Sequence, residues 1–241
     1  MRKMNNKAAL IIGGSGGIGA EIARQMADKG IKVYSSYYNG QTAPQQASVS
    51  SFPIDVTDSL SVQNALSKIL KERQIDIVVF SATAPVENKP FMTIQWEDYA
   101  KHMDVQIKGL FNIVSALKGQ LKSKYKTKFI IILTEYCAGK PPASLSHYIT
   151  AKYALWGLAK SMAVELARYN CTVNMISPGM TDTRLISNLP SKLIEITAER
   201  NLLGRIAKPL DVARVVLFLA SDESEYLNGT NIFVNGGEVM V

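Results

Sequence analysis

A tyrosine and a lysine in the segment HYITAK have the spacing of a proton-transfer pair. Tyr148 and Lys152 are four residues apart, so on a helix both side chains would lie on one face. A free phenol has a pKa near 10, and a nearby ammonium group lowers that value because it stabilises the phenolate. Tyr148 would then donate a proton to a carbonyl oxygen as a hydride arrives, or accept one in reverse. Because such a pair alone is usually ordinary surface, the rest of the chain decides its meaning.

A glycine-rich turn near the N-terminus has the composition of a phosphate-binding loop. In LIIGGSGGIGAEIARQ, the residues Gly13, Gly17 and Gly19 fit the spacing G-x-x-x-G-x-G between an apolar run and a helical pattern. Residues without a Cβ let the backbone approach a phosphate at a helix N-terminus, where N–H groups favour anions. The turn, with Ser15 and Ile18, is predicted to bind a dinucleotide. The simpler alternative is a glycine turn that binds no ligand.

The end of the predicted second strand bears on the choice of dinucleotide. An acidic residue there would hydrogen-bond the adenosine ribose and repel a 2′-phosphate. In VYSSYYNG this place holds Tyr37 and Tyr38, with no Asp or Glu. The feature typical of NAD binding is therefore missing. NADP is favoured over NAD, although no Arg follows that would bind the phosphate.

Short apolar runs alternate with amphipathic segments along the whole chain. Strands are predicted at KAALII, IKVYSS, SFPI, IDIVVF, KFIIIL, TVNMI and NIFV, several of them continuously apolar, as in a sheet covered on both faces. Helical periodicity covers residues 17–29, 59–72, 96–119, 147–169 and 209–220. This alternation predicts one α/β domain over residues 1–241, built on a doubly wound parallel sheet flanked by helices.

Two irregular regions interrupt this pattern. Residues 39–51 are polar and predict a loop in the second crossover. Residues 180–205 contain RLISNLPSKLIEITAERNLL, which is apolar enough to form a lid over a substrate. Loops at the carboxyl ends of parallel strands are where such sheets bind ligands.

Composition narrows the class of protein. No run approaches the roughly 20 apolar residues of a membrane span, and the apolar run after the basic start is too short for a signal peptide. A cytoplasmic protein without a membrane anchor is expected. Two Cys and two His residues without motif spacing argue against a metal site.

The charge pattern is compatible with an acidic partner. The formal net charge of +7 suits an anionic ligand or partner, and equally suits solubility alone. A run of lysines is explained most simply as a solvated helix end, and its members are Lys118, Lys122, Lys124, Lys126 and Lys128. Nucleic-acid binding is not expected, because the run lacks interleaved base-stacking aromatic residues beyond Tyr125.

Taken together, the chain resembles the short-chain dehydrogenase/reductase family over nearly its whole length. The resemblance is carried by GGSGGIG at 13–19, DV at 55–56, YITAK at 148–152, VNMISPGMTDT at 173–183 and RIAKPLDVARVVLFLASDESEYLNGTNIFVNGG at 205–237. Within this family, the chain resembles most the classical branch, which includes 3-ketoacyl-carrier-protein reductases. It implies a seven-stranded Rossmann-type sheet, a homo-oligomer (tetramer or dimer), and NADP-dependent reduction of a carbonyl. The substrate would be a small molecule or a 3-ketoacyl thioester on a carrier protein.

The resemblance also implies roles for single residues. Asp55 and Val56 would meet the adenine, and Lys152 would bond the nicotinamide ribose. The residues that would lie against the nicotinamide are Pro178, Gly179 and Thr183. The family's Asn-Asn-Ala-Gly motif aligns with Phe80-Ser81-Ala82-Thr83, which differs from it at most positions. Ser81, Ala82 and Thr83 would still face the cofactor.

Two further correspondences concern proton supply and docking. The helix Asn that supports a proton relay to the Lys aligns with Gln106, which keeps the amide on a longer side chain. A basic residue before the fifth strand helps to dock the carrier in ketoacyl reductases, and Lys126 and Lys128 lie near that place. Arg168 is near a second such position.

The family's catalytic serine has no direct counterpart. It normally precedes the Tyr by thirteen residues, which selects Glu135 in ILTEYCAG. A one-residue insertion would instead bring Thr134 into register, and anchoring on residues 138–139 would select Tyr136. On a strand, residues 134 and 136 share one face and residue 135 has the other.

The alternatives differ in chemistry. Thr134 would nearly conserve the hydroxyl in a carbonyl reductase, and this is the favoured hypothesis. Glu135 would instead hold an amine or a C=N substrate, as acidic residues do in some pterin-reducing relatives. A third hypothesis is a catalytically degenerate nucleotide-binding or partner protein, because residues 80–83, Gln106 and Glu135 all depart from the family pattern.

Overall fold

A seven-stranded parallel sheet forms the centre of the computed structural model, which describes residues 6–38, 46–187 and 189–240. The strand order is β3-β2-β1-β4-β5-β6-β7, so the direction of winding reverses between β1 and β4. In doubly wound sheets a ligand binds outside the carboxyl ends of the strands at such a reversal. The strands are β1 (Ala8–Ile12), β2 (Lys32–Tyr37), β3 (Val49–Pro53), β4 (Ile77–Phe80), β5 (Thr127–Ile132), β6 (Cys171–Pro178) and β7 (Asn231–Val234).

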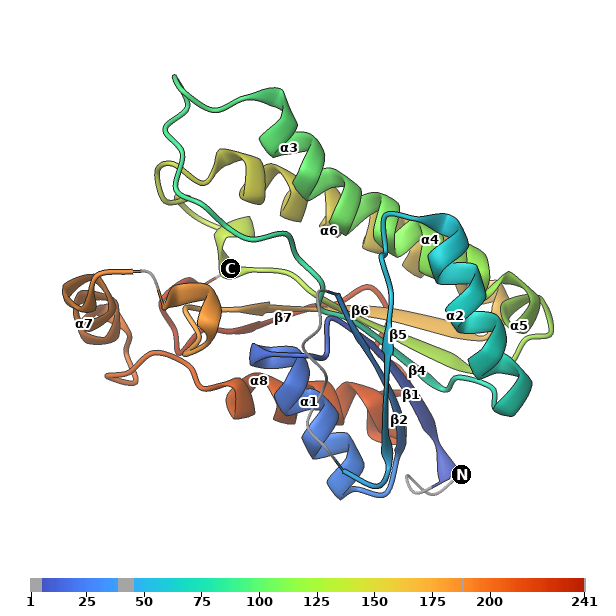
Figure 1. The fold of residues 1–241 in the computed structure, drawn as a ribbon. Helices are drawn as coiled ribbons and strands as arrows, with labels where there is room; N and C mark the ends of the chain where they lie inside the picture. The colour runs from blue at the N-terminus through green and yellow to red at the C-terminus, as the bar shows by residue number, and fades with distance from the viewer. Residues whose placement is uncertain (1–5, 39–45, 188, 241) are drawn as a thin grey trace.

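Helices cover both faces of the sheet (Figure 1). One face carries α1 (Gly17–Asp28) and α8 (Pro209–Ala220), and the other carries α2 (Ser59–Glu72), α4 (Gly109–Ala116) and α6 (Ser146–Glu165). Because side chains alternate along a strand, Leu10 of β1 enters one apolar cluster and Ile11 enters the other. The predicted Rossmann-type fold is confirmed.

The helical pattern predicted over residues 96–119 is confirmed, but the segment is not one regular α-helix. The segment divides into α3 (Trp96–Met103), a π-helical turn (Asp104–Lys108), α4 and α5 (Lys118–Lys122). A π turn contains an extra residue and rotates the next helical turns around the axis, and such turns often mark functional sites. Here the turn contains the fully buried Gln106.

The irregular regions also contain structure that the pattern does not predict. Strand β3 begins at Val49, inside the predicted loop 39–51, whose residues 39–45 lie outside the described part of the chain. The predicted lid contains a 3-10 turn (Arg184–Ile186) and helix α7 (Ser191–Arg200). Figure 1 shows α7 projecting away from the sheet. Among the helices of the described residues, none combines the length and apolar character of a bilayer span.

The substitution Gly109→Ala tests the close contact between α4 and the segment after β3. A Cβ at Gly109 would lie 2.9 Å from Cγ2 of Val56, so we expect it to lower the free energy of unfolding by about 1–3 kcal/mol. The control is Gly157→Ala in α6, where a Cβ meets nothing within 4 Å. This control should raise stability by about 0.5–1 kcal/mol. Equal effects of the two substitutions in urea unfolding would contradict the predicted contact.

Candidate active site

Helix α6 brings Tyr148 and Lys152 together beside the end of β5. Their exposed fractions are 8% and 3%, and the Lys152 Nζ lies 5.8 Å from the centre of the Tyr148 ring. The Lys152 Nζ also donates a hydrogen bond of 2.7 Å to the carbonyl oxygen of Ile132. The ammonium group is thus fixed at the last residue of β5, one helical turn from the phenol.

Burial sets the protonation of this pair. It raises the pKa of Tyr148, and a side-chain interaction with Thr134 only partly offsets the rise. Burial lowers the pKa of Lys152 to about 8. The expectation that Lys152 lowers the pKa of Tyr148 is therefore not met in this structure, because the loss of solvation dominates. At neutral pH the phenol carries its proton, which is the state that a proton donor requires.

A cavity of about 340 Å³ lies in front of Tyr148. Its polar wall contains Thr134 and Tyr136 beside Tyr148, and Pro178 and Gly179 at the end of β6 also line it. The apolar lining comes mainly from the start of α1, the segments around β5 and the start of α6, and the predicted lid. It includes Ile18, Leu133, Leu145, Leu185, Ile186 and Leu189. Helix α7 is not part of this lining, so only the start of the predicted lid faces the cavity.

Thr134 and Glu135 point to opposite sides. Thr134 has an extended backbone with φ of −157°, and its Oγ1 accepts a hydrogen bond from the backbone N–H of Tyr136, which starts a short 3-10 turn. Thr134 and Tyr136 line the cavity, whereas Glu135 does not. A Cβ built on Gly179 would lie 3.2 Å from Oε2 of Glu135, which places that carboxyl behind the cavity wall. Glu135 at the serine position is thus a prediction that the geometry contradicts.

The Glu135 carboxyl lies in an unusual environment. It is 1% exposed, and its Oε2 has no hydrogen-bond partner among the described residues. Burial, with the nearby Glu238 carboxyl, raises its pKa to about 7. No cation contributes to that shift, so ionisation of Glu135 works against the folded state.

The glycine turn has the geometry that a dinucleotide phosphate requires. Gly13 has φ of +81°, and a Cβ there would lie 2.9 Å from the backbone nitrogen of Ala82. A Cβ at Gly19 would lie 2.1 Å from the Gly13 carbonyl oxygen. No side chain caps the start of α1 at Gly16, where a Cβ would meet nothing within 4 Å. Because this helix end is uncapped, its N–H groups are available to an anionic phosphate.

The other residues predicted to bind the cofactor lie around this turn. Ser81 follows β4 and donates its backbone N–H to the Ile12 carbonyl at 2.9 Å, while Thr183 packs against Gly17. Tyr37 ends β2, and Tyr38 is 61% exposed. Their contacts with a cofactor remain predictions, as do those of Ser15.

Asp55 and Val56 have structural partners of their own. Asp55 Oδ1 accepts hydrogen bonds from the backbone N–H and the hydroxyl of Thr57, at 2.9 and 2.7 Å, in the turn before α2. Val56 packs against Gly109. Asp55 therefore acts as a turn residue, which was the simpler alternative, and its contact with adenine remains a prediction.

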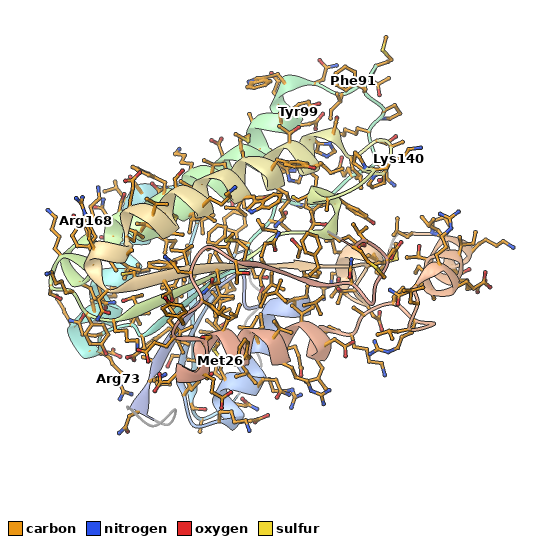
Figure 2. All side chains as sticks on the ribbon, turned by 180° about the vertical axis from the view of Figure 1, so that it is seen from behind. Met26, Arg73, Phe91, Tyr99, Lys140 and Arg168 are labelled. Carbon is orange, nitrogen blue, oxygen red and sulfur yellow. The ribbon has the colours of Figure 1, made fainter. Side chains whose placement is uncertain are left out.

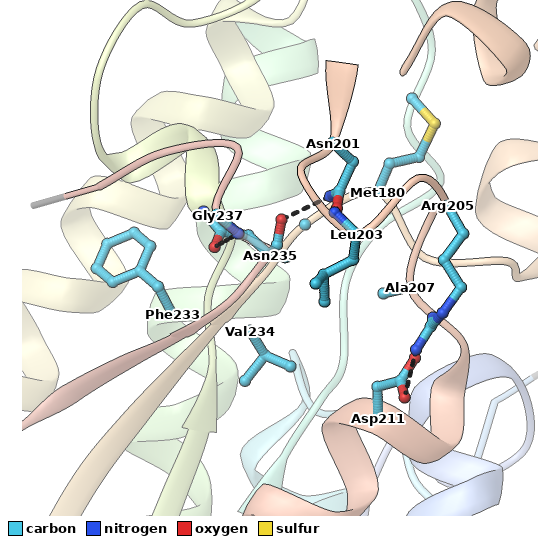
Figure 3. A pocket seen from close by; sticks show the side chains of 12 residues that line it. Met180, Asn201, Leu203, Arg205, Ala207, Asp211, Phe233, Val234, Asn235 and Gly237 are labelled. Carbon is cyan, nitrogen blue, oxygen red and sulfur yellow. Dashed lines mark hydrogen bonds and ion pairs between the residues drawn. The ribbon is translucent and has the colours of Figure 1, made fainter. Parts of the chain in front are cut away.

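A second, smaller cavity of about 220 Å³ shares Gly179 and Met180 with the first. Figure 3 shows the residues that line it. Its polar groups bond to one another, since Asn201 Nδ2 donates to the Asn235 carbonyl at 2.7 Å and Arg205 pairs with Asp211 at 2.6 Å. The Asn201–Asn235 contact joins the end of α7 to the segment after β7. The Arg205–Asp211 contact joins the loop before α8 to α8 itself. The cavity marks the base of the predicted lid.

The lysine run lies at the wrong edge of the sheet for docking at this cavity. Lys126 pairs with Glu225, and Lys128 is buried and donates to Ser224 Oγ at 2.8 Å. Both lysines stand at the amino end of β5, whereas Thr134 follows its carboxyl end. In Figure 2, Arg168 also lies at the opposite end of the molecule from Phe91 and Lys140. Carrier docking through Lys126 and Lys128 within one chain is therefore not supported.

Sequence patterns identified only part of the cavity. Tyr136 was one of three alternatives for the serine position, yet it lines the cavity together with Thr134. Residues 86–88 also line it, and no motif marks them. The strand-face argument was the one available signal, because it places residues 134 and 136 on the same side.

Glu135→Gln should change how stability depends on pH. Because the folded state raises the carboxyl pKa from 4.5 to about 7, the native protein loses stability as pH rises through that range. The Gln variant avoids this loss, so its advantage in unfolding free energy should grow between pH 4.5 and 7, by up to about 3 kcal/mol. Glu238→Gln should move the window to lower pH. A pH-independent difference in denaturant titrations would refute this account.

Comparison with known proteins agrees with this geometry. A family model described as enoyl-(acyl carrier protein) reductase matches residues 13–238. The 3-oxoacyl-[acyl-carrier-protein] reductase of Rickettsia conorii is 31% identical, with all of each chain covered. A short-chain type dehydrogenase/reductase from Mycobacterium marinum is 28% identical with a TM-score of 0.89, over 99% of this chain and 98% of that one. Aldohexose dehydrogenase of Thermoplasma acidophilum is 27% identical with a TM-score of 0.87, over 98% and 94%.

These matches span the glycine turn, the Tyr148–Lys152 pair and the last strand in one alignment. They set aside the hypothesis that the chain is only a degenerate nucleotide-binding protein. The chain belongs to the short-chain dehydrogenase/reductase family and is an NAD(P)-dependent oxidoreductase that acts on carbonyl or hydroxyl groups.

Proposed function

We propose that this protein reduces the ketone of an apolar substrate, with NADPH as the reductant. The observation that carries the proposal is the buried Tyr148 facing a cavity beside Thr134, with Lys152 one turn away. When bound, the nicotinamide cofactor supplies the hydride. Tyr148 donates its proton to the carbonyl oxygen, and Thr134 offers a hydroxyl to the same oxygen. Lys152 holds a positive charge near the phenolate that remains.

The lining of the cavity supports an acyl substrate. Leu185, Ile186 and Leu189 form an apolar wall that suits a fatty chain, whereas a sugar would need more polar partners. Since the relatives are named as 3-oxoacyl-carrier reductases, a 3-ketoacyl thioester on a carrier protein is the substrate we infer. Glu135 lies behind the wall, so its carboxyl does not face a C=N substrate in the cavity.

The absence of an acid at the end of β2 supports NADP over NAD, because Tyr37 would not repel a 2′-phosphate. We also infer a cytoplasmic homo-oligomer. The exposed faces of α4 and α6 carry apolar residues that a second copy would cover, namely Phe111, Tyr153 and Val164.

Assays of NADPH oxidation test the reaction class. We expect turnover with 3-ketoacyl thioesters and little or none with trans-2-enoyl thioesters or cyclic imines, because the cavity offers a proton donor for an oxygen.

Tyr148→Phe should abolish turnover and leave the dissociation constant of NADPH nearly unchanged. Exposed Tyr226→Phe serves as the control. Unchanged turnover in Tyr148→Phe would refute the mechanism, and preference for the enoyl substrate would refute the reaction.

The choice between Thr134 and Glu135 has its own test. Thr134→Val should lower kcat by about 10²–10³-fold, because it removes one donor to the developing oxyanion. Thr134→Ser keeps the hydroxyl and should retain most of the rate. Glu135→Gln should change kcat far less than Thr134→Val at pH 6. If Glu135→Gln proved the more damaging substitution there, Glu135 rather than Thr134 would serve the substrate.

A further inference from the structure

Three chain segments meet at Glu135, behind the wall of the active-site cavity. They leave the carboxyl ends of β5, β6 and β7, which are neighbours in the sheet. The Met180 backbone and the Asn235 side chain both lower the pKa of the Glu135 carboxyl, so both lie against it. A Cβ on Gly179 would lie 3.2 Å from its Oε2. The carboxyl therefore contacts the segment after β6 and the segment after β7 at once.

The contacts on the β6 side belong to the active site. Gly179 and Met180, which we call the shared wall, line both cavities. The backbone N–H of Gly179 donates to the Val234 carbonyl oxygen at 3.0 Å, so the shared wall is also attached to β7. Gly179 is one of the residues predicted to lie against the nicotinamide. A change at the Glu135 carboxyl would thus reach the surface that orients cofactor and substrate.

Residues 235–239, the C-terminal turn, cover the carboxyl from the other side. Asn235 closes this turn, because its Oδ1 accepts the backbone N–H of Gly237 at 3.2 Å and its Nδ2 donates to the Val239 carbonyl oxygen at 2.8 Å. The carbonyl oxygen of Asn235 accepts the bond of 2.7 Å from Asn201 at the end of α7. The C-terminal turn is therefore joined to the predicted lid as well as to Glu135.

The groups around Glu135 favour its neutral form. Among the described residues, the charged side chain that acts on it is Glu238 of the C-terminal turn, which is another carboxyl. Tyr136 also faces the two carboxyls and stays neutral, because burial and their charges raise its pKa to about 12. Arg200 acts on Glu238. Since Glu135 is 1% exposed and its Oε2 lacks a partner, its ionised form would be poorly solvated and without a cation.

We propose that Glu135 is a positioning residue whose proton keeps the shared wall and the C-terminal turn together, and that loss of this proton loosens both. A neutral carboxyl costs far less to bury than a carboxylate. Once ionised, Glu135 gains solvation only when the half-buried Glu238 and its turn move away. The protein would therefore reduce its substrate faster below neutral pH than above it. This inference rests on the proposed function, because it concerns the same cavity.

Glu135→Gln tests the role of the proton, because Gln has the shape of the neutral acid and cannot ionise. With a pKa of about 7, Glu135 keeps its proton in roughly nine-tenths of molecules at pH 6 and in roughly one-tenth at pH 8. We expect kcat/KM of the variant to be within about twofold of the native value at pH 6 and about three- to tenfold higher at pH 8. Comparison at one pH cancels the titration of Lys152, whose pKa is about 8.

Glu238→Gln reports on the same proton from the C-terminal turn. Removing the Glu238 charge lowers the pKa of Glu135, so the fall in kcat/KM should begin at a lower pH than in the native protein. The fall should persist, because burial is the larger cause of the raised pKa. Exposed Glu165→Gln on α6 is the matched control and should follow the native profile.

Two results would contradict the proposal. A fall at the native pH in both Glu135→Gln and Glu238→Gln would mean that another group titrates. A Glu135→Gln variant that is slower than the native protein by the same factor at every pH would show a packing role only.

Hydrogen exchange without substrate separates this inference from the proposed function. At pH 8, backbone amides of residues 179–183 and 235–239 should exchange faster in the native protein than in Glu135→Gln, and at pH 6 they should exchange equally. Amides of β1 should not differ at either pH. Equal exchange at pH 8 would overturn the inference even if the ketone is reduced. The predicted difference in a protein that reduces no ketone would leave the inference standing and refute the proposed substrate.

Discussion

The bond between Lys152 Nζ and the carbonyl oxygen of Ile132 anchors the site. It joins α6 to the last residue of β5 at 2.7 Å, and Lys152 is buried. A charged donor in such surroundings requires an acceptor, so the helix is fixed in both rotation and height against the sheet. The position of Tyr148, one turn earlier, is set by this bond. The same bond restricts the position of Thr134, because Thr134 lies only two residues after Ile132, the last residue of β5.

This anchoring explains why one short segment serves two purposes. Residues 134 and 136 contribute to the cavity, and residue 135 fills the space behind its wall. Strand β5 ends at Ile132, and a 3-10 turn over Glu135–Cys137 follows Thr134. The Glu135 carboxyl is therefore buried near the end of β6. Its raised pKa shows that this burial disfavours the ionised form.

The sequence was sufficient to predict the sheet, because continuous apolar runs such as IDIVVF have few alternatives in a chain of this length. It was also sufficient for the glycine turn and the Tyr148–Lys152 pair, which local spacing defines. The π turn around Gln106 could not be predicted, since a buried amide disturbs helical periodicity only weakly. The lining by residues 86–88 could not be predicted either, because it depends on how a loop returns across the sheet.

Gly179 separates the two cavities as a partition one backbone thick. A side chain there would press against the backbone of Asn235 on one side and against Glu135 on the other. The cavity wall at Gly179 therefore has no room for a side chain. The wall formed by Leu185, Ile186 and Leu189, whose side chains are exposed or half-buried, is the part of the cavity where substitutions can change its size and shape.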